Sequence, residues 1–168
     1  MVIHRTQASP GPERNFDDLV IAPATAGDSA ELLVLQRCCW VQEAIANETL
    51  DHPALRESLD EIREWLTTWS VWQVRLGHRL VGAVRARLDG DAWEIGRLMV
   101  APDLAGRGLG RRLLAFAEAA APASARRLAL YTGAGSVRNI AMYSRAGYEL
   151  AESSVPGAVH LVKPRCHT

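Results

Sequence analysis

Residues 94–114 have the sequence EIGRLMVAPDLAGRGLGRRLL, in which a strand-like segment, a glycine-rich turn and a helix-like segment follow one another directly. The turn contains three alternating glycines, Gly106, Gly108 and Gly110. Glycine has no Cβ, so the backbone N–H groups of such a turn can approach an anion closely, and the positive end of the helix dipole points at it. The stretch predicts either a phosphate-binding turn or a tight connection between a strand and a helix.

Two common nucleotide-binding patterns are excluded by the residues around this turn. A Walker loop ends in Gly-Lys-Ser/Thr, whereas Gly110 is followed by Arg111 and Arg112. The dinucleotide pattern G-x-G-x-x-G needs a glycine three residues after Gly108, where this chain has Arg111. The arginines Arg107, Arg111 and Arg112 are well placed to contact phosphate groups.

The rest of the chain alternates between strand-like and helix-like segments. Residues 71–100 form three extended segments divided by Gly77 and His78 and by Asp89 and Gly90, which predicts an antiparallel meander. The expected strands are residues 19–23, 71–76, 79–88, 92–100, 127–132, 148–155 and 158–163, and the expected helices are residues 25–46, 53–69, 109–121 and 136–147. The predicted fold is α/β, with a mixed, mostly antiparallel central sheet flanked by helices in the order β-α-α-β-β-β-α-β-α-β-β.

The composition indicates one ordinary globular domain. The chain has 168 residues, of which 48% are hydrophobic and 23% are charged, well away from the signature of disorder. Residues 1–17 mix Pro, Gly and polar residues without periodicity, so we expect a flexible arm followed by a single domain over residues 18–168. The 19 basic residues balance the 19 acidic ones, which argues against a nucleic-acid partner.

The cysteines and histidines favour a reducing setting without a metal site. The three cysteines are odd in number, and the adjacent Cys38 and Cys39 are poorly placed to bridge each other. The five histidines show no metal-ligand spacing, and no apolar run approaches the ~20 residues of a membrane helix. We therefore expect a cytoplasmic protein with no metal and no membrane partner.

Residues 94–114 resemble motif A of the GNAT superfamily of acyl-CoA-dependent N-acyltransferases, and residues 139–148, NIAMYSRAGY, resemble its motif B. The order of the expected elements from about Leu19 to Lys163 is similar to the GNAT fold, so the resemblance covers nearly the whole chain. It implies transfer of an acetyl group from acetyl-CoA, as co-substrate, to a primary amine. One position departs from the family pattern, because Ala105 stands where Gln or Arg is customary at the pyrophosphate, which implies a weaker or rearranged phosphate contact.

The resemblance also implies which residues hold the cofactor. Backbone groups of Leu98, Met99 and Val100 would lie alongside the pantetheine arm, while their side chains are expected in the core. The residues whose N–H groups would hold the pyrophosphate are Gly106, Arg107, Gly108, Gly110 and Arg111. Asn139 would hydrogen-bond the cofactor or order a water molecule.

Tyr143 is the candidate general acid. Acetyl transfer to an amine needs an acid for the departing thiolate and a base for the attacking ammonium. Tyr143 lies four residues after Asn139 on an expected helix, so the two side chains share a face. The resemblance implies a tyrosine at this position that protonates the CoA sulfur, and the competing interpretation is an aromatic residue that packs the helix onto the sheet.

Glu94 is the candidate base. Strict strand alternation puts its carboxylate on the same mostly apolar face as Gly96, Leu98 and Val100, where a charged group is not expected for packing alone. The alternative is a chain of water molecules, which other members of the superfamily use.

The acceptor is expected at the first two helices and the connection between them. From Glu43 to Glu64 there are seven acidic residues against two basic ones, with Trp40, Trp65 and Trp69 nearby. This acidic segment would suit a small cationic amine with an apolar body, although solvated helix faces and core tryptophans explain it equally well. By contrast, residues 105–145 hold seven arginines and one acid, as an anionic CoA would require.

Other interpretations stay open. The acceptor could be a peptide or protein amine instead of a small molecule, and the domain could bind acyl-CoA as a sensor without turnover. A homodimer is also open, because the closing hairpin could supply an edge.

Overall fold

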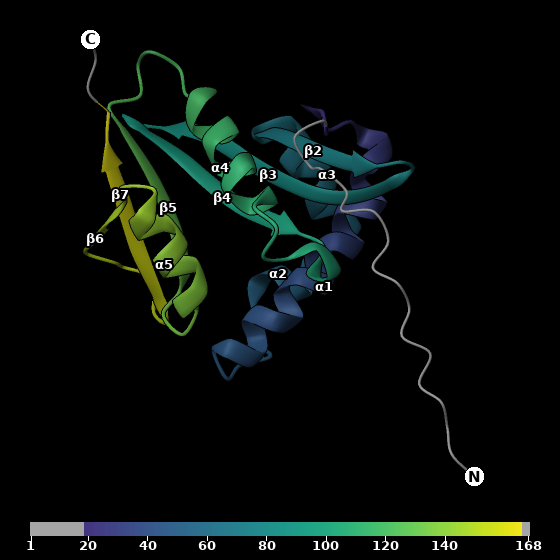
Figure 1. Cartoon of the computed structure of the whole chain (residues 1–168), viewed down its shortest axis with the longest axis horizontal. Helices are drawn as coiled ribbons and strands as arrows, with labels where there is room; N and C mark the ends of the chain where they lie inside the picture. The colour runs from purple at the N-terminus through teal and green to yellow at the C-terminus, as the bar shows by residue number, and fades with distance from the viewer. Residues whose placement is uncertain (1–18, 166–168) are drawn as a thin grey trace.

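The structure is a computed structural model that describes residues 19–165 (Figure 1), so the predicted arm, residues 1–17, lies outside the described residues. The strands are β1 (Ile21–Pro23), β2 (Ser70–Leu76), β3 (Arg79–Asp89), β4 (Ala92–Val100), β5 (Arg127–Gly133), β6 (Glu149–Ala151) and β7 (Ala158–Pro164). The helices are α1 (Ser29–Ala46), α2 (Pro53–Arg56), α3 (Leu59–Thr68), α4 (Leu109–Ala119) and α5 (Val137–Arg145), with short 3-10 turns η1 (Ala26–Asp28) and η2 (Pro102–Leu104).

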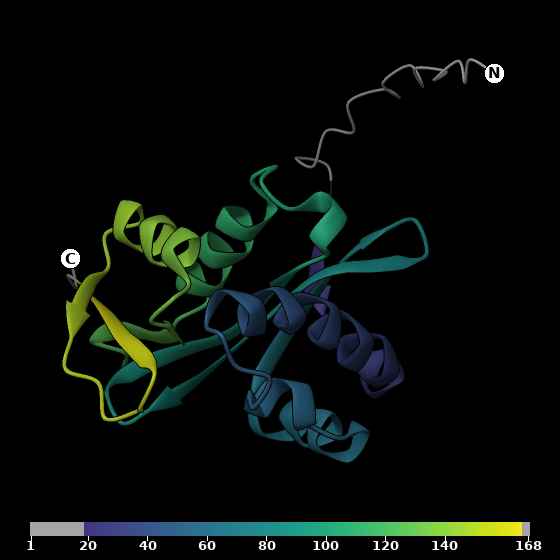
Figure 2. The same cartoon turned by 90° about the horizontal axis from the view of Figure 1, so that it is seen from below.

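The strands form one seven-stranded sheet over the described residues, in the order β1-β2-β3-β4-β5-β7-β6. Neighbouring strands are antiparallel except β4 and β5, which are parallel. Helices α1, α2 and α3 lie on one side of the sheet, and α4 and α5 lie on the other (Figure 2). The predicted mixed, mostly antiparallel sheet flanked by helices is confirmed.

Side chains from both helical layers close the core against the sheet. Ile62 of α3 and Leu113 of α4 are fully buried, and each such side chain stabilises the fold by roughly 1.5–3 kcal/mol. Trp93 of β4 faces α4, because its indole N–H donates a 2.8 Å hydrogen bond to the carbonyl of Ala117. This packing of α4 on β4 fixes the place of the glycine-rich turn, which joins the two elements.

The expected single helix over residues 53–69 is wrong, because two helices, α2 and α3, occupy this range. Ser58 starts the second one with a capping box: its N–H donates to the Glu61 carboxylate at 2.7 Å, and its hydroxyl accepts from the Glu61 N–H. A capping box stabilises a helix start, so the chain breaks at Glu57 although the apolar period continues. The break brings Glu57 within reach of the sheet.

Strand β4 carries a β-bulge at Arg97, whose φ is 48°. Arg85 of β3 pairs with Gly96, and Ala83 of β3 pairs with Met99. Between these two pairs β4 therefore contains one more residue than β3. One extra residue reverses the alternation of side chains beyond it.

The bulge corrects the predicted face of Glu94. Two residues further along, Gly96 lies on the α3 side of the sheet, since a Cβ there would be 3.9 Å from Cζ3 of Trp69. Val100 lies on the opposite side, since its Cγ2 would be 3.7 Å from a Cβ on Gly110 of α4. Glu94 therefore shares a face with Gly96, and the prediction that it also shares one with Val100 is wrong.

Strands β4 and β5 separate beyond their first rungs. They pair from Ala92–Ile95 against Arg127–Leu130, and the bulge on β4 follows directly. In Figure 1 the two strands lie close together at the end near the C-terminus and far apart at the other end. We call the region between residues 96–100 of β4 and residues 131–133 of β5 the opening.

Candidate functional site

The glycine-rich turn is exposed and passes through two left-handed residues. Gly106 and Gly108 have φ values of 79° and 88°, which residues with a Cβ rarely adopt. A Cβ on either would have no described atom within 4 Å, apart from its own neighbours in the chain. The N–H of Arg112 donates to the carbonyl of Gly108 at 3.1 Å, so the amides before Arg112 form the free first turn of α4. The turn has the space, the backbone donors and the helix dipole to hold a diphosphate.

The start of α4 also meets α5. A Cβ on Gly110 would lie 3.7 Å from Val100 and 3.8 Å from the sulfur of Met142 on α5. The end of β4, the glycine-rich turn and α5 thus come together at one side of the opening.

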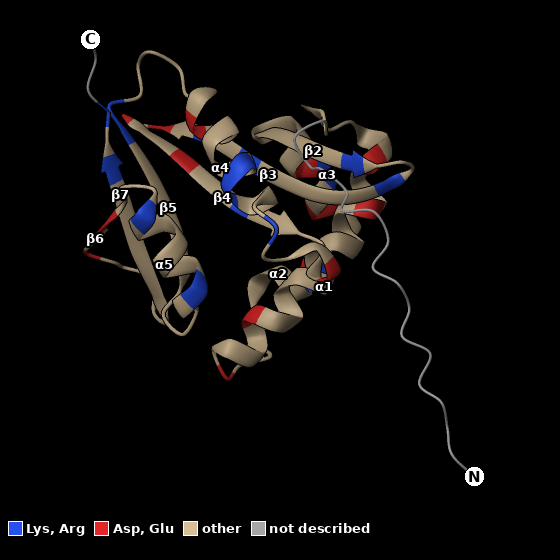
Figure 3. Ribbon diagram, viewed as in Figure 1, with Lys and Arg blue, Asp and Glu red and all other residues tan. Residues whose placement is uncertain are grey.

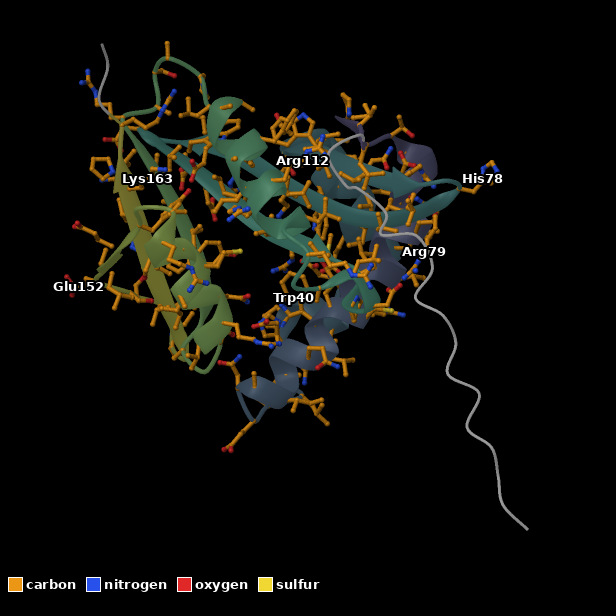
Figure 4. All side chains as sticks on the ribbon, viewed as in Figure 1. Trp40, His78, Arg79, Arg112, Glu152 and Lys163 are labelled. Carbon is orange, nitrogen blue, oxygen red and sulfur yellow. The ribbon has the colours of Figure 1, made fainter. Side chains whose placement is uncertain are left out.

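Three arginines follow this turn or lie within it, and they differ in their contacts. Arg107 and Arg111 are exposed, and Figure 3 colours the basic positions of the ribbon blue on α4, on the preceding loop and on α5. Arg112, labelled on α4 in Figure 4, donates to the carbonyl of Leu19 at 2.6 Å. Arg112 therefore anchors the start of the described chain, while Arg107 and Arg111 are exposed, and a role for them toward phosphates stays a prediction.

Backbone groups of β4 beyond the bulge alternate between β3 and the opening. The N–H of Ala101 donates to a carbonyl of β3 at 2.8 Å, so in an antiparallel ladder Met99 also faces β3. The polar groups of Leu98 and Val100 then face the opening, where the Cys39 thiol donates to the Val100 carbonyl at 3.2 Å. Burial raises the pKa of Cys39 to about 12, which keeps this thiol a donor. The expected backbone contacts to pantetheine therefore stay possible for Leu98 and Val100, whereas the backbone groups of Met99 are used in the pairing with β3.

Tyr143 lies on α5 and is 7% exposed. Its ring meets Tyr148 edge to face, with ring centroids 6.0 Å apart. Burial, and to a smaller extent the charge of Glu43, raises the pKa of the Tyr143 phenol above its ordinary value. The phenol is therefore protonated at neutral pH and holds its proton more tightly than a free tyrosine does.

Side chains of α1 clasp the start of α5. Glu43 accepts hydrogen bonds from the Ser136 hydroxyl and, at 2.9 Å, from the side-chain amide of Asn139. Asn47 donates to Ser136 at 3.0 Å and accepts from the N–H of Gly135 at 2.7 Å. These two residues of the α1 end, Glu43 and Asn47, join α1 to the β5–α5 connection, and we call this set of bonds the clasp.

The clasp is a feature that sequence reasoning missed. Glu43 entered only as one of the acids of the segment 43–64, and its partners lie 93 and 96 residues further along the chain. Asn139, expected to contact the cofactor, donates to Glu43 in this structure. No local spacing indicates a contact between helices so far apart in sequence.

Glu94, the expected base, is held by an arginine. Its Oε2 accepts from Nε and Nη2 of Arg87, both at 2.9 Å, and its side chain is 25% exposed. Arg87 in turn lies 4.2 Å over the ring of Trp69. Glu94 pairs in the sheet with Ala129 of β5, in the part of β4 that precedes the opening.

The three tryptophans near the expected acceptor site are covered by arginines of the chain itself. The guanidinium of Arg85 lies 4.3 Å from the ring centroid of Trp65 and 4.1 Å from that of Trp69. Arg97 on the bulge lies 5.1 Å from the ring centroid of Trp40, and Figure 4 labels Trp40. The cation–π positions that a cationic acceptor would use at these rings are already taken.

Several acids of the segment 43–64 also have partners within the chain. The ion pairs are Asp51 with Arg56, Asp60 with Arg63, and Glu57 with Arg97. The Glu57 pair is the buried one, at 2.9 Å and with side-chain exposures of 16% and 17%. The excess of acids in the sequence therefore overstates the negative charge available to an acceptor.

Within residues 19–165, no group of three or more His, Cys, Asp or Glu side chains is arranged to hold a metal ion. Over the same residues, no helix is long and apolar enough to span a membrane.

Comparison with known proteins identifies a matching family model, which is described as the acetyltransferase (GNAT) family and matches residues 32–148. That span reaches from α1 to Tyr148 and includes the glycine-rich turn, the opening and the clasp. No curated protein matches the chain significantly.

Solved structures share the fold. The PaiA N-acetyltransferase from Thermoplasma acidophilum, in complex with coenzyme A, is 15% identical with a TM-score of 0.67, and the match covers 88% of this chain and 99% of that one. A ribosomal-protein-alanine N-acetyltransferase from Brucella melitensis is 22% identical with a TM-score of 0.67, covering 88% and 100%. A GNAT family acetyltransferase from Elizabethkingia anophelis with acetyl-CoA bound is 18% identical with a TM-score of 0.64, covering 89% and 99%.

Proposed function

Because the chain belongs to the acetyltransferase (GNAT) family, we propose that it transfers an acetyl group from acetyl-CoA directly to a primary amine. The observation that carries this proposal is the arrangement around the opening. The glycine-rich turn follows the end of β4, and the buried side chain of Tyr143 lies on α5, which packs against the start of α4 at Gly110.

The donor is proposed to be acetyl-CoA, which would supply the acetyl group as a thioester. Gly106, Gly108 and Gly110 with Arg107 and Arg111 would hold its diphosphate, and Leu98 and Val100 would hold its pantetheine arm at the opening. Two solved relatives of the same fold contain coenzyme A or acetyl-CoA. Their ligands and the free first turn of α4 support this assignment.

Tyr143 is proposed as the general acid. A thiolate that leaves acetyl-CoA must be protonated, and a phenol with a raised pKa holds its proton until that moment. The attacking ammonium also needs a base. Two carboxylates on the α1–α3 side of the sheet are candidates: Glu94, to which the sequence points, and Glu43 of the clasp.

The acceptor is proposed to be a small-molecule amine. The acidic segment 43–64 favours a cationic one, whereas the arginines over Trp40, Trp65 and Trp69 remove the aromatic part of that argument. A protein or peptide amine is the second candidate, supported by the relative that acts on a ribosomal-protein alanine. The cytoplasmic location, which rests on the free thiols of Cys38 and Cys39, and the homodimer remain predictions.

A thiol-release assay with acetyl-CoA tests the proposed function. The amines are polyamines, aminoglycosides, amino acids and short peptides, and mass spectrometry identifies the acetylated product. Release of thiol together with an N-acetyl product supports the proposal and names the acceptor class. Binding of acetyl-CoA by calorimetry without any product favours a sensor domain instead.

A further inference from the structure

The opening between β4 and β5 is bridged by one carboxylate that the family resemblance did not assign. Glu43 projects from the last turns of α1, and its two oxygens reach Ser136 and Asn139 at the start of α5. Helix α1 packs on β3 and β4, so the carboxylate extends from the β4 half of the molecule to the β5 half. Resting on the proposed function, we propose that Glu43 is the general base that takes a proton from the acceptor ammonium.

The clasp brings Glu43 close to the candidate acid. Asn139, which Glu43 contacts directly, precedes Tyr143 by one helical turn, and side chains with this spacing on a helix are neighbours about 5–6 Å apart. The backbones of the α1 end and of the β5–α5 connection also lie close together, because a Cβ on Gly135 would overlap the carbonyl oxygen of Ala46. A thioester seated at the opening would thus meet Tyr143 from α5 and Glu43 from α1.

The partners of the two carboxylates separate their roles. Glu43 is bound by a hydroxyl and an amide, both neutral groups whose bonds an incoming ammonium can replace. Glu94 is bound by two N–H donors of one arginine, and its ion pair is part of the stack on Trp69. An acceptor ammonium at Glu94 would have to displace Arg87.

The charge of Glu43 acts to raise the pKa of three groups, which are Tyr143 on α5, His52 on the connection after α1, and Cys39 on α1 itself. His52 is the competing base. Its Nδ1 already accepts the N–H of Ala54 at 3.2 Å, and burial, with the charge of Arg97, lowers the pKa of His52. The Nδ1 lone pair of neutral His52 therefore caps α2. Protonation of Nδ1 would break this hydrogen bond, which argues against His52 as the base.

The proposed step balances in atoms and charge. Glu43 takes one proton from the ammonium, and the nitrogen then forms a bond to the acetyl carbon. The bond between this carbon and the CoA sulfur breaks, Tyr143 gives its phenolic proton to the sulfur, and the phenolate recovers the second proton of the nitrogen. Glu43 releases its proton to solvent, so each amide formed yields one thiol and one proton.

The experiment compares Glu43→Gln with two control variants on the full chain. Glu149→Gln removes the same charge from an exposed position of β6, outside the acidic segment 43–64, and Ser136→Ala removes a partner of the clasp while leaving the carboxylate. The kcat of each is measured from pH 5 to 9 with the best amine of the panel, and acetyl-CoA binding is measured by calorimetry. We expect Glu43→Gln to lower kcat about 100-fold or more at neutral pH, with unchanged acetyl-CoA affinity.

The pH profile separates a base from a structural support. With the base in place, kcat reaches a plateau above the acidic limb; in Glu43→Gln it should instead rise steadily with pH as the free amine increases. Glu149→Gln and Ser136→Ala should keep the plateau. A plateau retained in Glu43→Gln, an equal loss in Ser136→Ala, or loss of the acidic limb in Glu94→Gln instead would overturn the proposal. These outcomes concern the base alone, whereas an unmodified chain that acetylates no amine overturns the proposed function and the base together.

Discussion

Glu43 of α1 accepts a 2.9 Å hydrogen bond from the side-chain amide of Asn139 on α5. These residues are 96 positions apart in sequence, and they lie on opposite sides of the place where β4 and β5 separate. One bond therefore links the helical segment expected to face the acceptor to the helix that carries Tyr143. The relationship ties the position of the candidate acid to α1.

Tyr143→Phe tests the candidate acid. The change removes the hydroxyl and keeps the ring contact with Tyr148, so kcat should fall by roughly 10²- to 10⁴-fold while acetyl-CoA affinity stays within about twofold. Steady-state kinetics and calorimetry measure the two effects. Tyr148→Phe is the matched control, because Tyr148 is buried like Tyr143 and its ring contacts that of Tyr143. Equal activity of the two variants would remove Tyr143 from the mechanism.

Gly108→Ala tests the glycine-rich turn. The φ of 88° at Gly108 costs a residue with a Cβ about 1–2 kcal/mol, and the methyl group would occupy open space at the turn proposed to hold the diphosphate. Denaturant unfolding should show that loss, and calorimetry should show weaker acetyl-CoA binding. Gly27→Ala, at a glycine without positive φ, is the control. Unchanged binding in a destabilised Gly108→Ala would place the diphosphate elsewhere.

Glu57→Gln tests the buried ion pair beneath the bulge. Removing one partner leaves Arg97 charged, 17% exposed and without its carboxylate, which should lower the free energy of unfolding by about 3 kcal/mol. Asp60→Asn breaks the exposed pair with Arg63 and should cost below about 1 kcal/mol. Urea unfolding of both variants makes the comparison, and similar losses would show that the Glu57 pair contributes no more than a surface pair.

Asp28→Asn tests the pH dependence of stability. Burial works against ionisation of Asp28, but hydrogen bonds from Thr25 and Arg75 outweigh it and hold its pKa below the ordinary value. Because the folded pKa lies below the unfolded one, this stabilisation is present above about pH 4 and is lost as the pH falls toward the folded pKa.

Asp28→Asn should therefore be less stable than the unmodified chain at neutral pH, by about 1–2 kcal/mol. The difference should shrink as the pH falls below about 4. Urea unfolding at a series of pH values measures both. If the two proteins keep a constant difference in the free energy of unfolding across this pH range, the charge of Asp28 does not stabilise the fold.

Local pattern was sufficient to predict most of the framework. The strand, the turn and the helix of residues 94–114 follow one another in the sequence, so local patterns are sufficient to predict them. Strand β4 occupies the expected residues 92–100. The two misjudged details depend on contacts between elements. The break at Glu57 is selected by the Ser58 cap, and the bulge at Arg97 is revealed by its pairing with β3. A glycine inside a strand, Gly96, was the available signal for that bulge.

The candidate site was predicted less completely. Tyr143 and the glycine-rich turn belong to short motifs, so their places follow from local sequence. Glu43 acquires its partners only when α1 crosses to the β5–α5 connection, which no spacing within α1 indicates. The tryptophans were assigned to the right region, but their arginine partners lie on β3 and β4 and were not considered.

We expect acetyl-CoA to lie at the opening with its thioester between Glu43 and Tyr143. A crystal structure of this chain with coenzyme A would test this position. The diphosphate should lie on the amides of residues 106–111, and the sulfur should lie within about 3.5 Å of the Tyr143 hydroxyl. Coenzyme A bound with its sulfur away from the opening, or with its diphosphate off the glycine-rich turn, would rule this position out.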